Sequence, residues 1–171
     1  MNLRSNSITE VPRMADWIAL IISFVICFVA AGVGGLLTSR AIEEWYRGLT
    51  KPSWNPPEWA FGPVWTVLYI LMAISAWLVW EEGGFDEQLI PLAVFGVQLA
   101  LNVIWSGVFF YKRMILGGLV EVVAFWFAIL ATIIAFWSAS EIAALLLIPY
   151  IAWVSIASYL NYTIWRLNRV Q

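Results

Sequence analysis

Five long apolar stretches, almost free of charge, constrain this chain more than any other feature. An α-helix needs about 20 mainly apolar residues to cross the hydrocarbon core of a membrane. Stretches of that length run approximately over Ala15–Leu37, Trp59–Trp80, Leu89–Phe110, Gly117–Ser138 and Ile142–Trp165. Transmembrane β-strands would alternate apolar and polar residues over about ten positions, and these stretches do not. The sequence therefore predicts an all-α membrane protein, a bundle of five transmembrane helices.

The lengths of the connections suggest one transmembrane domain over 15–166, with tails at 1–14 and 167–171. Three loops are short, whereas the first, Thr38–Glu58, is long and contains the segment KPSWNPPEW. Its prolines disfavour regular helix, so we expect a stiff, extended segment. It acts either as a lid over a site or as an aromatic anchor at the membrane surface. Pro149 is expected to kink the last helix.

The basic residues indicate how the bundle is oriented. Arg4 and Arg13 lie on the side of the N-terminus, the second loop and the fourth loop. The other seven of the nine basic residues lie on the side of the first loop, the third loop and the C-terminus: Arg40, Arg47, Lys51, Lys112, Arg113, Arg166 and Arg169. The positive-inside rule places this second side in the cytosol and the N-terminus outside.

Three residue counts exclude several kinds of chemistry. The chain has 12 Trp, one Cys and no His. Without histidine there is no His-ligated haem or zinc and no Ser-His nucleophile, and the lone Cys27 cannot form an internal disulfide. We expect no metal site and no required cofactor. The net charge of −2 does not suggest a nucleic-acid partner, which leaves a membrane scaffold whose chemistry is mostly binding.

Polar and aromatic side chains recur on single helix faces. In the third stretch Gln98, Asn102, Trp105 and Phe109 share one face at helical spacing. The amides either join helices through hydrogen bonds or orient a ligand in an apolar pocket, and the sequence leaves both open. Similar stripes occur in the second stretch, with Trp65, Tyr69 and Met72, and in the fifth, with Trp153, Ala157 and Asn161.

Two further features concern helix contacts. Gly96 and Ala100 are four residues apart, and such small pairs let helices approach closely, either within the bundle or between protomers. Glu121 is one of two charged residues within the five stretches. It lies near the cytosolic end of its helix, where we expect an ion pair with Lys112 or Arg113.

Three segments resemble the TspO/MBR family, the translocator proteins once called peripheral-type benzodiazepine receptors. They are WYRGLTKPSWNPPEWAFGPVWTVLYILM, QLALNVIWSGVFF and IPYIAWVSIASYLNYTIWR, and the similarity covers the chain after Ala15. The resemblance implies a five-helix fold, commonly a homodimer, and points to a bacterial-type member. It also implies binding of porphyrins such as protoporphyrin IX, of sterols in the animal members, and of benzodiazepine-type ligands.

The resemblance assigns roles to individual residues. The family's pocket residues correspond to Tyr46, Trp65, Asn102, Trp153 and Ala157. Its sterol-recognition segment corresponds to Leu160, Tyr162 and Arg166, which also fit a weak pattern proposed for cholesterol contact. Together with the polar stripes, the predicted ligand-binding residues are Tyr46, Trp65, Tyr69, Gln98, Asn102, Trp105, Phe109, Trp153 and Ala157, with Gly96 and Ala100 at a dimer interface.

The resemblance also leaves three functions open. The first is tetrapyrrole binding for sensing, scavenging or stress response, with ring stacking in the pocket and propionates meeting basic residues at its cytosolic mouth. The second is a light- and oxygen-dependent breakdown of porphyrin, attributed in bacterial and algal members to the two pocket tryptophans, here Trp65 and Trp153. The third is transport of porphyrin or lipid. The residues favour binding over turnover, and the missing histidine favours free porphyrin over iron haem.

Overall fold

The computed structural model describes residues 14–169. The predicted N-terminal tail, with Arg4 and Arg13, lies outside this range except for Met14. The described residues form helices and no strand: α1 Met14–Glu44, the 3-10 turn η1 Tyr46–Gly48, α2 Glu58–Glu81, α3 Gly84–Ser106, the π-helical segment η2 Gly107–Tyr111, α4 Ile115–Trp137, α5 Glu141–Leu146 and α6 Ile148–Asn168. Because η2 continues α3 and α6 continues α5, five helical rods are long and apolar enough to cross a membrane. The predicted five-helix bundle is confirmed.

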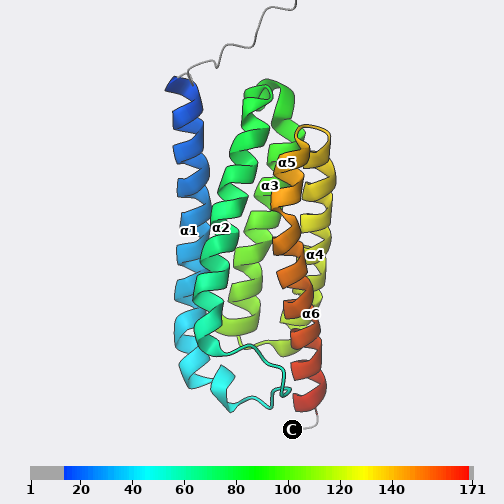
Figure 1. The fold of residues 1–171 in the computed structure, drawn as a ribbon. Coiled ribbons are helices and arrows are strands. Elements are labelled where there is room, and N and C mark those ends of the chain that lie inside the picture. The colour runs from blue at the N-terminus through cyan, green and yellow to red at the C-terminus, as the bar shows by residue number, and fades with distance from the viewer. Residues whose placement is uncertain (1–13, 170–171) are drawn as a thin grey trace, which may run out of the picture.

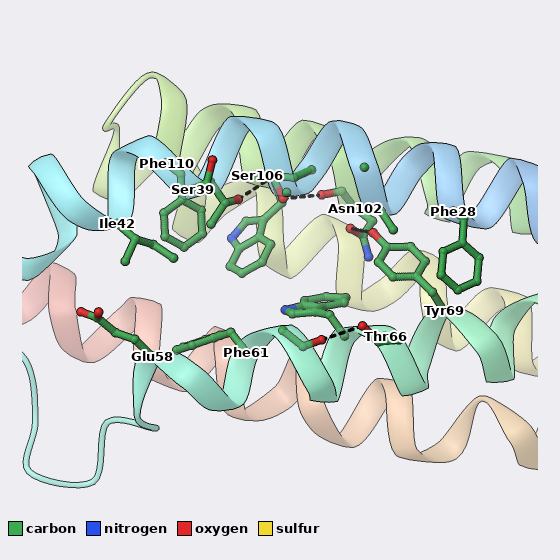
Figure 2. Close-up of a pocket in the computed structure, with 18 residues that line it drawn as sticks. Phe28, Ser39, Ile42, Glu58, Phe61, Thr66, Tyr69, Asn102, Ser106 and Phe110 are labelled. Atoms are coloured by element: carbon green, nitrogen blue, oxygen red, sulfur yellow. Dashed lines mark hydrogen bonds between the residues drawn. The ribbon is translucent and has the colours of Figure 1, made fainter.

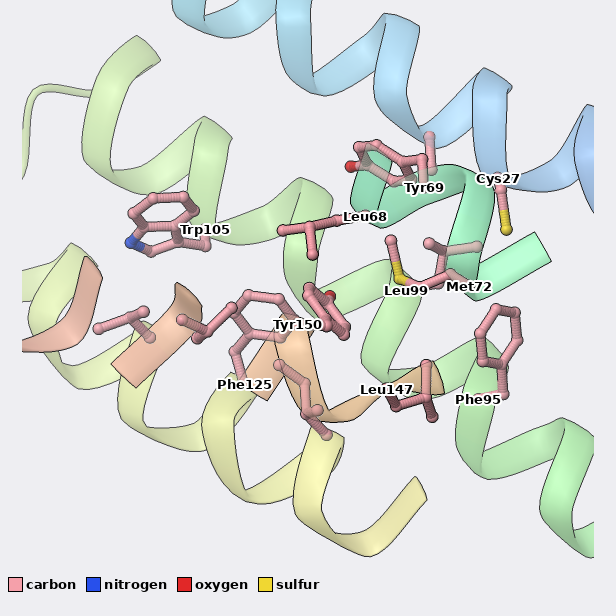
Figure 3. Close-up of a cluster of buried hydrophobic side chains, with 14 of the residues drawn as sticks. Cys27, Leu68, Tyr69, Met72, Phe95, Leu99, Trp105, Phe125, Leu147 and Tyr150 are labelled. Atoms are coloured by element: carbon pink, nitrogen blue, oxygen red, sulfur yellow. The ribbon is translucent and has the colours of Figure 1, made fainter. Parts of the chain in front are cut away.

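The five rods stand side by side (Figure 1). α1 packs against α2 and α3, α3 against α4, and α4 against α6, while α5 contacts both α2 and α4. Large side chains from different rods meet in the middle, among them Met72, Phe125, Phe136 and Tyr150, all fully buried. Figure 3 shows Tyr69, Phe125 and Tyr150 within this central cluster.

The first helix is longer than the sequence predicted. Residues 38–44, expected in the first loop, are helical, so that part of the predicted lid is wrong. The apolar stretch ends near Leu37, but the residues after it still favour helix, and the Thr38 hydroxyl donates to the Gly34 carbonyl, 2.7 Å away, within the helix. The end of the apolar pattern marks the membrane boundary and not the end of the helix.

Prolines interrupt the rods at two places. α3 begins at Gly84, five residues before the predicted start, and contains a non-helical residue at Gln88 (φ −109°, ψ 21°), three positions before Pro91. A proline ring clashes with the carbonyl four residues earlier, which accounts for an irregular turn at this point. Pro149 lies in the first turn of α6, directly after the break between α5 and α6 at Leu147. The helix is thus interrupted next to Pro149, where the sequence predicted a kink.

The remaining first loop, 45–57, is attached to both its own start and the far side of the bundle. The Lys51 ammonium donates to the carbonyls of Tyr46, Arg47 and Leu49 at 2.6, 3.2 and 3.3 Å. Two hydrogen bonds join Thr50 to Asn168 near the end of α6, and the Trp54 ring stacks on Tyr159 at 5.2 Å. The loop therefore crosses the end of the bundle and lies beside α6 (Figure 1).

Candidate ligand-binding pocket

A cavity of about 520 Å³ lies between α1, α2 and the end of α3 with η2 (Figure 2). Glycine provides part of its space, because a Cβ atom at Gly32, Gly35 or Gly62 would meet no other atom within 4 Å. The cavity is lined by Phe28, Ala31, Gly32, Gly34, Gly35, Thr38, Ser39, Ile42, Glu58, Phe61, Gly62, Trp65, Thr66, Tyr69, Asn102, Trp105, Ser106 and Phe110. Cavities of this size hold small organic ligands in many proteins.

Aromatic rings form much of the wall. The rings of Trp65 on α2 and Trp105 on α3 lie 6.3 Å apart between centroids, at an interplanar angle of 37°. Tyr69 lies 5.8 Å from Trp65, and Phe110 meets Trp105 edge to face at 5.9 Å. Flat rings bury a large apolar area and favour stacked or edge-to-face contacts with other rings. The wall is therefore suited to a flat, conjugated ligand.

A chain of hydrogen bonds fixes the inner end of the cavity. The Tyr69 hydroxyl donates to Asn102 Oδ1, Asn102 Nδ2 donates to the Tyr150 hydroxyl, and the Tyr150 hydroxyl donates to Gln98 Oε1, each at 2.9 Å. Gln98 Nε2 in turn approaches the Met72 sulfur at 3.9 Å. These bonds join α2, α3 and α6, as expected for intramembrane amides. Asn102 also lines the cavity. It therefore joins helices through hydrogen bonds and is also placed to orient a ligand, the two roles that the sequence left open.

Glu58, the first residue of α2, lines the outer end of the cavity (Figure 2). Its carboxylate accepts from Arg47 Nε at 3.0 Å and from Arg47 Nη2 at 2.9 Å. Hydrogen bonding and charge from Glu58 raise the pKa of Arg47, which stays protonated. None of the described residues that line the cavity is basic. A ligand at this end meets a carboxylate first and a guanidinium behind it.

Three predicted site residues lie behind the wall and do not line the cavity. Gln98 belongs to the hydrogen-bond chain, and Phe109 stacks on Trp105 at 6.1 Å. Tyr46 packs against Phe110 at 5.7 Å and donates its hydroxyl to Asn55 Oδ1 at 2.9 Å. Burial, followed by the charge of Glu58, raises the pKa of Tyr46 to about 12, so its hydroxyl remains a neutral donor. These residues support the lining side chains.

Trp153 and Ala157 occupy a different part of the bundle. Trp153 lines a second, more open hollow of about 460 Å³ between α2 and α6, together with Pro63, Val64, Val67, Leu68, Pro149, Ala152 and Ile156. Its ring meets Phe61 edge to face at 6.0 Å, and Ala157 packs on the central apolar cluster. Trp65 and Trp153 therefore do not line the same hollow. In the sterol-motif segment Leu160 is buried, whereas Tyr162 and Arg166 are exposed.

The sequence reading missed the contribution of α1. Eight of the lining residues belong to it, including Phe28, Ala31, Gly35 and Thr38. These residues recur at helical spacing on one face of α1. Several of them are small, and a sequence pattern of hydrophobic residues is detected mainly from large side chains, so this face was not recognised. Phe61 was also missed, although it lies one turn before Trp65 on the same face of α2.

The ion pair predicted for Glu121 is wrong. Arg113 lies in the turn before α4 with φ 56°, and its Nη2 contacts Glu44 Oε2 at the end of α1, 2.8 Å away. Lys112 is exposed. Both carboxylate oxygens of Glu121 are buried and have no hydrogen-bond partner among the described residues. Glu121 follows this turn by almost two turns of helix, whereas Arg113 meets Glu44 at the end of α1.

Comparison with known proteins identifies relatives in bacteria and animals. The model of the TspO/MBR family matches residues 23–166. A protein named "Tryptophan-rich protein TspO" from Chlorobaculum tepidum is 42% identical over 144 residues, which cover 84% of this chain and 91% of that protein. "Protein CrtK" from Rhodobacter capsulatus is 40% identical over 146 residues, 85% of this chain and 89% of that protein. The human "Translocator protein" is 42% identical over 146 residues, 82% of this chain and 86% of that protein. The chain thus belongs to the TspO/MBR family.

Proposed function

We propose that this protein binds a tetrapyrrole, protoporphyrin IX or a related porphyrin, within the membrane and acts in porphyrin sensing, scavenging or stress response. One observation carries the proposal: the cavity of about 520 Å³ has indole rings on two of its walls, Trp65 and Trp105, and an amide at its inner end, Asn102. A flat macrocycle gains dispersion and stacking energy from such rings. A small number of fixed polar groups then orients it.

Other ligands suit the same chemistry. The lining of the cavity is mostly apolar, with few polar side chains, so it also admits sterol or benzodiazepine-type molecules. Leu160, Tyr162 and Arg166 remain a candidate sterol contact at the end of α6. No bound metal or cofactor is needed for this mode of binding, because ring contacts and amide hydrogen bonds supply the affinity.

The two alternative functions make different demands. Light- and oxygen-dependent porphyrin degradation relies on Trp65 and Trp153 together, yet these residues line separate hollows. We therefore place binding first. Degradation is favoured if a new product forms in light and oxygen and if Trp65→Phe loses this product while it still binds porphyrin. Concentration-dependent porphyrin flux across proteoliposomes is the result that favours transport.

The test is a titration of the purified protein with protoporphyrin IX in the dark, followed by quenching of tryptophan fluorescence. Trp65→Phe removes part of the stacking surface, worth about 0.5–1.5 kcal/mol, and is expected to weaken binding about two- to tenfold. Trp137→Phe is the matched control, because Trp137 is an exposed tryptophan at the end of α4 and its loss leaves the same number of indoles. Equal dissociation constants for the two variants would contradict the proposal.

We also propose how the protein is assembled in the membrane. Gly96 and Ala100 are exposed on the outer face of α3, where a second copy can approach closely, so a homodimer through this face is our preferred assembly. The first loop, the third loop and the C-terminus are proposed to face the cytosol, on the basis of their excess of lysine and arginine.

A further inference from the structure

Arg47 is the cation best placed to meet a ligand at the outer end of the cavity. Its ion-pair partner, Glu58, is itself a lining residue. Three other cations of this end are engaged elsewhere: Lys51 donates to three backbone carbonyls, Arg113 pairs with Glu44, and the Arg169 guanidinium lies over the Trp165 ring. Lys112 and Arg166 are exposed and do not line the cavity. A ligand anion in the cavity can therefore bind Arg47 only at the position that the Glu58 carboxylate already occupies.

The contact between Arg47 and Glu58 has the form that a ligand carboxylate would take. Two guanidinium nitrogens, Nε and Nη2, donate to the same oxygen, Glu58 Oε2, at 3.0 and 2.9 Å, and Nε also lies 3.3 Å from Oε1. Hydrogen bonds between a guanidinium and a carboxylate are charge-assisted, and a ligand carboxylate can accept from the same two nitrogens. The side chains of Arg47 and Glu58 are 59% and 34% exposed, and exposed ion pairs are weak. The pair can open at low cost when another carboxylate competes.

We propose that Arg47 is a carboxylate subsite of the pocket and that Glu58 is its built-in competitor, which sets the preference of the pocket between acidic and esterified porphyrins. The inference rests on the proposed function. A ligand carboxylate must displace Glu58 from Arg47 and then leaves the Glu58 carboxylate beside the cavity. An esterified ligand does not displace Glu58, because its carbonyl oxygen carries no charge, and the ion pair between Arg47 and Glu58 stays intact. Glu58 thus discriminates by charge and not by shape.

The experiment compares two ligands, protoporphyrin IX and its dimethyl ester, in the full-length protein in detergent. Glu58→Gln removes the competitor, so binding of the diacid is expected to tighten about two- to fivefold, the range set by an exposed ion pair. Arg47→Gln is expected to weaken the diacid by a similar factor. The dimethyl ester should bind all three proteins equally. Glu44→Gln and Arg113→Gln are matched controls, because they break an ion pair of the same kind away from the cavity.

A double variant, Arg47→Glu with Glu58→Arg, separates this role from a structural one. It keeps an ion pair between the first loop and α2 but places the cation in the cavity wall, so the diacid should bind at least as tightly as to the wild type. Equal changes for diacid and ester in Glu58→Gln, or no change for the diacid, would overturn the inference while the proposed function stands. If the wild type binds neither porphyrin, the proposed function is wrong and the inference falls with it.

Discussion

Buried polar side chains form two groups in this molecule. Those of Tyr69, Asn102 and Tyr150 have partners on neighbouring helices, all at 2.9 Å. Such interhelical bonds contribute about 0.6 kcal/mol each on average in membrane proteins. The second group, which includes Glu121 and Asn161, has buried side-chain atoms with no partner among the described residues. The first group fixes the inner end of the pocket, whereas burial without a partner is unfavourable for the second.

Glu121 provides a test of this view at the residue scale. Burying a charged or polar group without a hydrogen bond is unfavourable, so Glu121→Leu is expected to raise the free energy of unfolding by about 1–3 kcal/mol. Thermal unfolding in detergent measures the change. Glu43→Leu is the control, because Glu43 is exposed, and should stay within about 0.5 kcal/mol of the wild type. A loss of stability in Glu121→Leu would mean that the carboxylate is satisfied by something other than the described residues.

At the scale of single elements, small residues have two different uses. On α1 they face inward, where Gly32 and Gly35 leave room for the pocket. Where η2 meets α4 they permit close packing, since a Cβ atom at Gly118 would lie 2.7 Å from the Phe109 Cβ atom. On α3 the pair Gly96 and Ala100 faces outward, and a Cβ atom at Gly96 would meet nothing within 4 Å. This last pair faces away from the bundle and is available to a second copy of the chain.

The outward pair predicts the effect of a bulky substitution on assembly. Gly96→Leu places a large side chain at the proposed contact between two α3 helices, where close backbone approach is needed. We expect a shift from dimer to monomer, measured as the mass of the protein in detergent by light scattering. Val97→Leu is the control on the next residue, which is also exposed on α3. An unchanged dimer in Gly96→Leu would exclude this face as the interface.

At the scale of the whole molecule, the described lysines and arginines gather at one end of the bundle. The loops after α2 and α4, with the helix ends beside them, carry the acidic residues Glu81, Glu82, Asp86, Glu87 and Glu141 and no described lysine or arginine. The opposite end carries the first loop, the third loop and the end of α6. Its basic residues are Arg47, Lys51, Lys112, Arg113, Arg166 and Arg169, beside the acidic Glu43, Glu44 and Glu58. Figure 1 shows these two sets of connections at opposite ends. The asymmetry supports the proposed orientation.

Cysteine labelling tests the orientation of the bundle. Ser53→Cys lies in the first loop and Ser138→Cys at the end of α4, and both serines are exposed. The natural Cys27 is fully buried and should react little. With a membrane-impermeant maleimide on spheroplasts of a bacterial expression host, Ser138→Cys should be labelled and Ser53→Cys should be labelled only after lysis. The reverse pattern would contradict the proposed orientation.

The sequence by itself determined the five-helix architecture, the break at Pro149 and the family. A membrane span needs about 20 apolar residues and satisfies its own backbone hydrogen bonds, which is a local property of the chain. Helical spacing likewise placed Asn102 and Trp105 on one face. Only the tertiary structure decided which faces meet. It brought Trp105 to Trp65 and left Trp153 at another hollow, and it paired Arg47 with Glu58 and Arg113 with Glu44. These contacts depend on the rotation and order of the helices and on the length of α1, which no short stretch of sequence encodes.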